Sequence, residues 1–391
     1  MNKLTTITFC LAFSTNVLAN NDNYGFTTIK EVPITSVKNQ NRSGTCWAYS
    51  GLGFFEAELL RMGKGEYDLC EMFVAHKTYE DRAQKAVRLH GDISFSEGGC
   101  FYDVVYCMKN YGIVPEDAMP QPGTLCGDTL ANFRELFSLA TKYVTGISKG
   151  DYKKLSPAWP KGLNGILDAY LGEVPTKFIY NKKEYTPISF QKSLGLNMDD
   201  YINLTSYTHH PFYEQFILEI PDNWRWGSSY NIPIDELMQV ISNAINKGFT
   251  VAWASDVSEI GFTRDGLAVY PDIEKVNENE GTDMDYWLSM SEADRKKTLT
   301  QEPRPEKVFT QEERQKGYDN WETTDDHGML IYGKAKDKDG KEYFMVKNSW
   351  GKRGDYAGIW YASEAFVRNK TMNILVHKDA IPKSIANKLK L

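Results

Sequence analysis

The chain has 391 residues, of which 41% are hydrophobic, 25% charged and 13% aromatic. This composition excludes a disordered, collagen-like or coiled-coil chain, and the length corresponds to two or three domains of roughly 150 residues each. The net charge of −7 argues against nucleic-acid binding, which needs a concentrated positive surface. Six cysteines are too few for a disulfide scaffold.

The first residues have the pattern of an export signal. Lys3 precedes a weakly apolar stretch that ends at Val17, Leu18 and Ala19. Small side chains three positions and one position before the cleavage point suit signal peptidase, so we expect cleavage after Ala19 and an exported protein, periplasmic or secreted. No later stretch reaches the ~18 apolar residues that a membrane span requires, so no membrane anchor is expected.

Hydrophobic periodicity predicts the main elements in chain order. A short extended segment at 27–37 is followed by a polar turn and then by a helix from Cys46 to Gly63, because apolar residues recur there at helical spacing. Two more helices are expected at 71–90 and 101–111. Residues 128–225 show short alternations of mixed structure.

The second half of the chain has a clearer pattern. A helix is expected at 233–247 and a buried strand at 249–254, followed by a highly charged excursion at 272–326 with one or two helices. Two alternating apolar segments then flank Asp337-Lys338-Asp339-Gly340 between His327 and Trp350, which predicts a β-hairpin.

Cys46 is the candidate nucleophile. It lies at the first turn of the predicted helix, where the positive end of the helix dipole favours a thiolate. The adjacent Trp47 is expected to bury the helix while the turn leaves the sulfur accessible. The alternative interpretation is a buried structural cysteine.

A nucleophilic thiol needs a base, and the hairpin selects one of the six histidines. A turn centred on 337–340 pairs residues whose numbers sum to about 677, so His327 lies opposite Trp350. Side chains alternate along a strand, so Asn348 shares this face and can orient the imidazole. Met329, Ile331, Phe344 and Val346 are expected to continue the face as core. Gln40, six residues before Cys46, can donate to an oxyanion together with the Cys46 backbone N–H.

Four segments together resemble the signatures of papain-like cysteine peptidases, in chain order. The long spacing between Gly99 and His327 further resembles the bleomycin hydrolase / aminopeptidase C family. The segments are Gln40-Asn41-Arg42-Ser43-Gly44-Thr45-Cys46-Trp47, Gly98-Gly99, Asp326-His327-Gly328 and Asn348-Ser349-Trp350-Gly351.

This resemblance implies an α+β, two-lobed papain-like fold with large insertions. It implies five regions along the chain: a signal peptide at 1–19, a helical lobe with the nucleophile at 20–127, an inserted mixed segment at 128–225, a β-rich lobe with His and Asn at 226–377, and a C-terminal tail at 378–391.

The resemblance also implies roles for single residues in peptide hydrolysis. Cys46 is the nucleophile, His327 the general base and then the general acid, Asn348 the orienting amide, and Gln40 an oxyanion donor. Trp47 and Trp350 are shielding residues, with Trp350 covering the His–Asn hydrogen bond. Gly98, Gly99, Phe101 and Gly328 are the candidate substrate-binding residues. Peptides are the expected substrates, no cofactor is implied, and family members form a homo-hexamer.

The C-terminal tail decides between two modes of cleavage. In that family a C-terminal arm presents its terminal carboxylate to the substrate's amino group, and residues 376–391 resemble the start of such an arm, ending roughly a dozen residues early. Aminopeptidase action is therefore the leading expectation, and an endopeptidase with an open cleft is the alternative. An acyltransferase or a non-catalytic peptide-binding protein on the same scaffold are further alternatives.

Two other features carry no expected site. His209-His210-Pro211 has no third ligand at a recognisable spacing, so no metal site is predicted. Up to two disulfide bridges among Cys70, Cys100, Cys107 and Cys126 stay open, because sequence cannot choose between pairings.

Overall fold

The computed structural model describes residues 23–119, 123, 125, 126, 130–272, 291, 294, 297, 298 and 300–391. The expected signal peptide at 1–19 and residues 273–290 of the charged excursion lie outside these residues. The helices are α1 Cys46–Arg61, α2 Glu71–Arg88, α3 Phe101–Asn110, α4 Arg134–Ser148, α5 Trp159–Leu171, α6 Pro187–Leu194, α7 Ile234–Asn246, α11 Gln311–Asp319, α12 Glu364–Lys370 and α13 Lys383–Leu389. The strands are β1 Thr27–Glu31, β2 Leu125–Cys126, β3 Leu130–Ala131, β4 Phe178–Tyr180, β5 Lys183–Tyr185, β6 Tyr201–Thr205, β7 Gln215–Ile217, β8 Ser228–Asn231, β9 Val251–Ser255, β10 Leu267–Ala268, β11 His327–Lys336, β12 Glu342–Lys347, β13 Ile359–Ser363 and β14 Thr371–His377.

A ten-stranded sheet forms one side of the molecule. Its strand order is β10-β13-β12-β11-β9-β14-β6-β8-β7, and β1 pairs with β11 as well. The sheet therefore includes β1, which the sequence analysis placed in the helical lobe, and β6 and β7, which it placed in the inserted segment. Their backbones pair with β11, β14 and β8, and the apolar pattern of such short strands does not reveal these distant partners.

The β11–β12 hairpin has the predicted register at the end that carries the candidate site. Leu330 pairs with Lys347 and Ile331 with Val346, so the residue numbers sum to 677. A bulge between Ile331 and Gly333 shifts the pairing by one residue nearer the turn. The four residues expected to line the core face are buried: Met329, Ile331, Phe344 and Val346.

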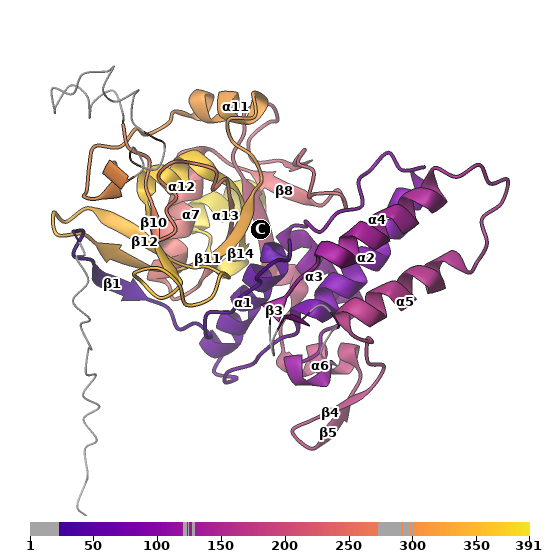
Figure 1. Cartoon of the computed structure of the whole chain (residues 1–391). Helices are drawn as coiled ribbons and strands as arrows, with labels where there is room; N and C mark the ends of the chain where they lie inside the picture. The colour runs from indigo at the N-terminus through magenta and orange to yellow at the C-terminus, as the bar shows by residue number, and fades with distance from the viewer. Residues whose placement is uncertain are drawn as a thin grey trace, which may run out of the picture.

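Two hydrophobic cores lie on opposite faces of the sheet. On one face, Leu330 and Ala252 pack into the core of α1 to α6; on the other, Met329 and Ile331 pack into the core of α7 and α13. Helix α1 contacts β11 and β9 directly and also contacts α2 and α3. Figure 1 shows α1 between the sheet and the long helices α2, α4 and α5. The start of α1 thus lies where the two halves of the molecule meet.

The C-terminal residues form a short helix on the α7 face of the sheet. Ile385 and Leu389 of α13 are buried in the α7 core, and Lys388 forms an ion pair with Glu236 of α7. Asn243 of α7 also donates a hydrogen bond to the Ala380 carbonyl. The helix α1 packs against the other face, so α13 and the nucleophile helix are separated by the sheet.

The cysteines whose side chains the structure describes are free thiols. Cys46 is half-buried, whereas Cys70, Cys100 and Cys107 are buried. No bridge forms among these four, and the side chain of Cys126 lies outside the described part of the chain. Among the described residues, no helix is both long and apolar enough to cross a membrane.

Candidate active site

Helix α1 begins at Cys46, as predicted. The turn before Cys46 is held by hydrogen bonds to Glu97, which belongs to a second segment of the chain. The Glu97 carboxylate accepts the Gly44 backbone N–H at 2.6 Å, while the Glu97 carbonyl accepts the Trp47 indole N–H at 3.1 Å. A Cβ atom at position 44 would lie 2.7 Å from the Glu97 side chain, so glycine is needed for this approach. Sequence analysis did not identify Glu97 as the residue that positions the nucleophile.

Three side chains lie in contact at the start of the hairpin: His327, Asn348 and Trp350. The Asn348 amide oxygen lies 2.8 Å from His327 Nε2, which leaves Nδ1 as the ring nitrogen available to exchange a proton with a thiol. The Trp350 ring stacks on the imidazole with centroids 4.7 Å apart and an angle of 29°. The structure therefore brings together the base, its orienting amide and the covering indole.

Strand β11 packs closely on α1, and this packing places His327 near Cys46. A Cβ atom at Gly328 would lie 2.7 Å from Ser50 Oγ and 3.4 Å from the Cys46 carbonyl oxygen, so only glycine allows this approach. Cys46 and His327 consequently line one cavity. Gly99 and Phe101, two of the expected substrate-binding residues, line the same cavity.

Gln40 is held in a fixed orientation by Ser43 and Ser349. Ser349 Oγ donates to its amide oxygen at 2.6 Å, and its amide nitrogen donates to the Ser43 carbonyl at 2.8 Å. An amide nitrogen carries two hydrogens, so one N–H is left for an oxyanion. The Gln40 backbone N–H also bonds to the Ser349 carbonyl, which fastens this loop to the Asn348 segment.

Trp47 is buried in the core of α1 to α6, as expected. Its ring lies against Gly99, where a Cβ atom would come within 2.8 Å of the indole, and it lines the cavity wall. Trp350 is the indole that stacks on the imidazole.

Burial has the largest effect on the pKa values of the two reacting groups, Cys46 and His327. It raises the pKa of the Cys46 thiol to about 12, and the opposing backbone N–H bonds of Gly328 and Trp47 do not offset it. Burial also lowers the pKa of His327 to about 4, against the opposing effect of the bond to Asn348. At neutral pH a neutral thiol therefore faces a neutral imidazole, which suits a general base. The sequence analysis expected the helix N-terminus to favour a thiolate, but desolvation outweighs it.

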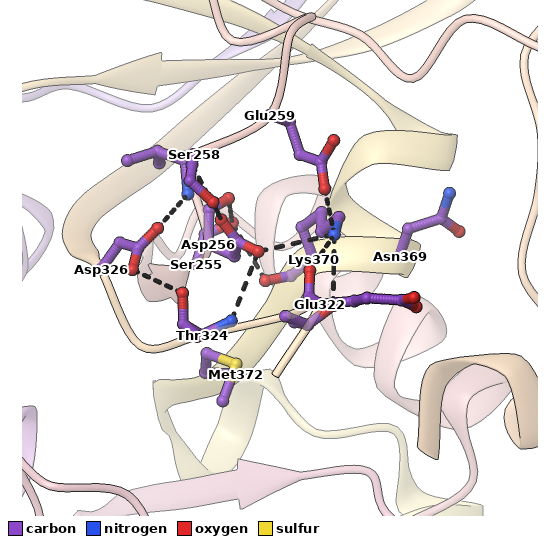
Figure 2. Close-up of polar contacts among 12 residues, drawn as sticks. Ser255, Asp256, Ser258, Glu259, Glu322, Thr324, Asp326, Asn369, Lys370 and Met372 are labelled. Carbon is purple, nitrogen blue, oxygen red and sulfur yellow. Dashed lines mark hydrogen bonds and ion pairs between the residues drawn. The ribbon is translucent and has the colours of Figure 1, made fainter. Parts of the chain in front are cut away.

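A buried ionic network holds the segment that precedes His327. Figure 2 shows Lys370 reaching Asp256 and Glu259, while Asp256 reaches the Thr324 backbone N–H at 3.3 Å. Lys370 also donates to the Glu322 carbonyl at 2.9 Å, and Thr324 Oγ1 donates to Asp326 at 2.7 Å. These bonds fix residues 322–326 and hence the position from which the imidazole enters the cavity.

The structure differs from expectation at Gly98. Its carbonyl already accepts a bond from Arg82 at 2.5 Å, and the Asp222 carboxylate lies against the space where a Cβ atom would be. Gly98 is therefore not open to an extended substrate in the way the resemblance implied. The reason is that Asp222 lies close to Gly98 in the fold, and no local pattern in the sequence predicts this contact.

The sequence analysis missed two aspartates that belong to this site. Asp222 and Asp325 line the cavity of Cys46 and His327. Burial raises the pKa of Asp222 to about 6, with Arg82 at 4.0 Å acting in the opposite direction. Burial, and then the charges of Asp222 and Asp326, raise the pKa of Asp325 to about 8. The cavity of Cys46 and His327 is thus lined by acidic side chains.

Comparisons with known proteins agree with this geometry. The model of the Peptidase C1-like family matches residues 306–391. The chain is 25% identical to aminopeptidase G of Lactobacillus delbrueckii subsp. lactis over 90% of this chain and 83% of that protein, and 23% identical to aminopeptidase C of Streptococcus thermophilus over 88% and 80%. The crystal structure of PepW from Lactobacillus rhamnosis HN001 superposes with a TM-score of 0.68 at 21% identity, covering 93% of this chain and 84% of that one.

Papain-like cysteine peptidases are the class that combines a nucleophile helix packed on a sheet with a base delivered by the central hairpin of that sheet. The predicted α+β, papain-like fold is thus confirmed. Within this class, the predicted resemblance to the bleomycin hydrolase / aminopeptidase C family is confirmed by the similarity to aminopeptidases G and C and by the match to the Peptidase C1-like model.

Proposed function

We propose that this protein is a cysteine aminopeptidase that removes the N-terminal residue of peptides. His327 Nδ1 takes the Cys46 proton as the sulfur attacks the scissile carbonyl carbon, and the oxyanion is held by Gln40 and the Cys46 backbone N–H. The C–N bond then breaks as His327 returns the proton to the leaving amine. Water hydrolyses the thioester with His327 as base, which releases the N-terminal amino acid and restores the thiol.

One observation carries the choice of an aminopeptidase: carboxylates lie in the same cavity as the nucleophile. An ionised Asp222 attracts the α-ammonium group of a substrate, and its position over Gly98 obstructs a longer N-terminal extension. Ala380, Ile381, Ile385 and Leu389 are buried in the α7 core on the other face of the sheet, and none of residues 378–391 lines this cavity. Asp222, which is ionised above a pH of about 6, therefore supplies the carboxylate that selects a free amino group. The named relatives are aminopeptidases, so the endopeptidase alternative is not favoured.

Binding of the amine also activates the thiol. The charges of Asp325 and Asp222 contribute to the raised pKa of Cys46, after burial and against the backbone bond from Gly328. A substrate ammonium bound beside the ionised Asp222 offsets its charge and so reduces that contribution. A free-amine substrate is therefore expected to lower the pKa of the thiol that attacks it, whereas an N-blocked substrate does not.

Replacing Asp222 by asparagine tests the proposal. The substitution keeps the shape of the side chain but removes its charge, so kcat/KM for free-amine peptides should fall by about 10–100-fold, the value of a hydrogen bond to a charged group. Hydrolysis of the same peptides with an acetylated N-terminus should stay as slow as in the wild type. The ratio of the two kcat/KM values measures the selectivity directly.

Two controls sharpen this measurement. Asp339→Asn removes an exposed aspartate in the β11–β12 turn and should leave the ratio unchanged. In the wild type, the ratio should fall as the pH drops through about 6, because Asp222 is ionised above its pKa and neutral below it. An Asp222→Asn protein with undiminished preference for free amines would show that another group selects them. Rapid cleavage of acetylated peptides by the wild type would overturn aminopeptidase action itself.

We also propose that the protein is exported after removal of residues 1–19. The proposal is supported by Lys3, the following apolar stretch and the small residues before Asn20. N-terminal sequencing of the mature protein should begin at Asn20, and a mature protein that retains Met1 or Asn2 in an exporting host would contradict it. Assembly into a homo-hexamer stays a prediction from the family resemblance.

A further inference from the structure

A cluster of two histidines and a glutamate lies on the surface outside the catalytic cavity. His209 and His210 follow strand β6, and Glu219 follows strand β7. Their candidate ligand atoms all lie within 4.8 Å of one another, the only such His, Cys, Asp and Glu cluster among the described residues. The sequence analysis found no third ligand for the histidine pair, because Glu219 reaches it through the path of the chain after β6 and not through a recognisable spacing.

The spacing of the three ligand atoms suits one metal ion. His209 Nε2 lies 3.0 Å from Glu219 Oε2, and His210 Nε2 lies 3.5 Å from Glu219 Oε1. Ligands bound at about 2.0–2.2 Å in a tetrahedron are themselves roughly 3.3–3.6 Å apart, which is close to both His–Glu distances. Two imidazoles and one carboxylate form a typical ligand set for Zn²⁺ with a fourth position open to water. Glu219 is 61% exposed, which leaves room for that water.

Surrounding residues hold the two rings in place. Both ends of the Gln315 amide lie within 3.3 Å of His209 Nδ1, so its oxygen can accept the Nδ1 proton while Nε2 binds a metal. The same oxygen accepts the Thr208 backbone N–H at 2.6 Å. The His210 ring stacks on Phe216 with centroids 4.4 Å apart. Metal sites depend on such outer contacts because they fix the ring orientation and the tautomer.

We propose that His209, His210 and Glu219 bind a divalent transition-metal ion of the Zn²⁺ type. The ion ties together the loop after β6, the loop after β7 and helix α11. Tyr318 of α11 supports this arrangement, since its hydroxyl donates to the Glu219 carbonyl at 2.7 Å. Glu219 is three residues before Asp222, so the site anchors the segment that enters the catalytic cavity.

Zinc titration of a Cys46→Ala protein tests the proposal. This background removes the catalytic thiol, which otherwise competes for Zn²⁺, and the protein must be free of a histidine tag and treated with chelator first. Calorimetry should show one Zn²⁺ bound per chain, and zinc should raise the unfolding temperature. His210→Gln or Glu219→Gln should weaken zinc binding by more than ~100-fold, which exceeds the 10–100-fold loss typical for an outer partner.

A matched control removes a histidine elsewhere. His90→Asn deletes an exposed imidazole at a backbone position with φ of 54°, which asparagine tolerates, and it should bind zinc as tightly as the parent protein. In the Co²⁺-loaded parent, a visible absorption band should appear and be lost in His210→Gln. Absence of stoichiometric zinc binding, or equal affinity in His210→Gln and the parent, would refute the site. Either result leaves the proposed peptidase activity untouched.

Discussion

Replacing Cys46 by alanine is expected to abolish peptide hydrolysis, with a loss of roughly 10⁴–10⁶-fold in kcat. The reason is chemical, because no other described thiol shares a cavity with His327 except Cys100, which is buried and bonded towards Asp103 and Asn223. Half-buried Cys46 contributes little packing, so the unfolding temperature should change little. Steady-state hydrolysis of a free-amine peptide, together with thermal unfolding, measures both effects.

Cys107→Ala is the matched control for the loss of a thiol. Cys107 is buried in α3 within the helical core, away from the cavity, so this variant should lose some stability and keep its turnover. Wild-type rates in the Cys46→Ala protein would show that another residue is the nucleophile.

Replacing Lys370 by methionine is expected to lower the free energy of unfolding by about 3–5 kcal/mol. Lys370 is 1% exposed and Asp256 is fully buried, so removal of the ammonium leaves a buried carboxylate without its ion-pair partner. The same ammonium holds the Glu322 carbonyl and Thr323 Oγ1, so the segment before His327 also loses its anchor. Urea unfolding measures the stability, and kcat should fall with the altered position of the imidazole.

Lys378→Met provides the comparison for this stability effect. Lys378 pairs with Asp200 at the surface and is 48% exposed, and such solvent-exposed pairs contribute little to stability. A Lys370→Met protein no less stable than Lys378→Met would mean that the network in Figure 2 does not support the fold.

The catalytic residues could be predicted from sequence because their relations are local or periodic. Helical spacing after Cys46 locates the start of α1, and strand alternation places His327 and Asn348 on one face, where the structure has them 2.8 Å apart. Asp222 and Glu219 follow no such period. The positions of Asp222 and Glu219 are set by contacts with residues 140 and 99 positions away, Arg82 and Tyr318.

The direction of the pKa shift of Cys46 likewise could not be predicted from the sequence. A helix N-terminus is visible in the sequence and predicts a lowered pKa for Cys46, but desolvation depends on the closeness of Gly328 and the cavity walls. Only the assembled fold reveals that burial is the larger effect. The same holds for β1 and β6, which join the large sheet through distant partners.

The claim that Cys46 is a nucleophile served by His327 is tested most directly by covalent labelling of the folded protein. A thiol-directed epoxide should add one equivalent to the wild type, located at Cys46 by peptide mass mapping, and none to the Cys46→Ala protein. His327→Ala should slow this reaction strongly, because the neutral thiol then has no base beside it. A folded wild-type protein that stays unlabelled at Cys46, or that reacts equally fast without His327, would contradict the account.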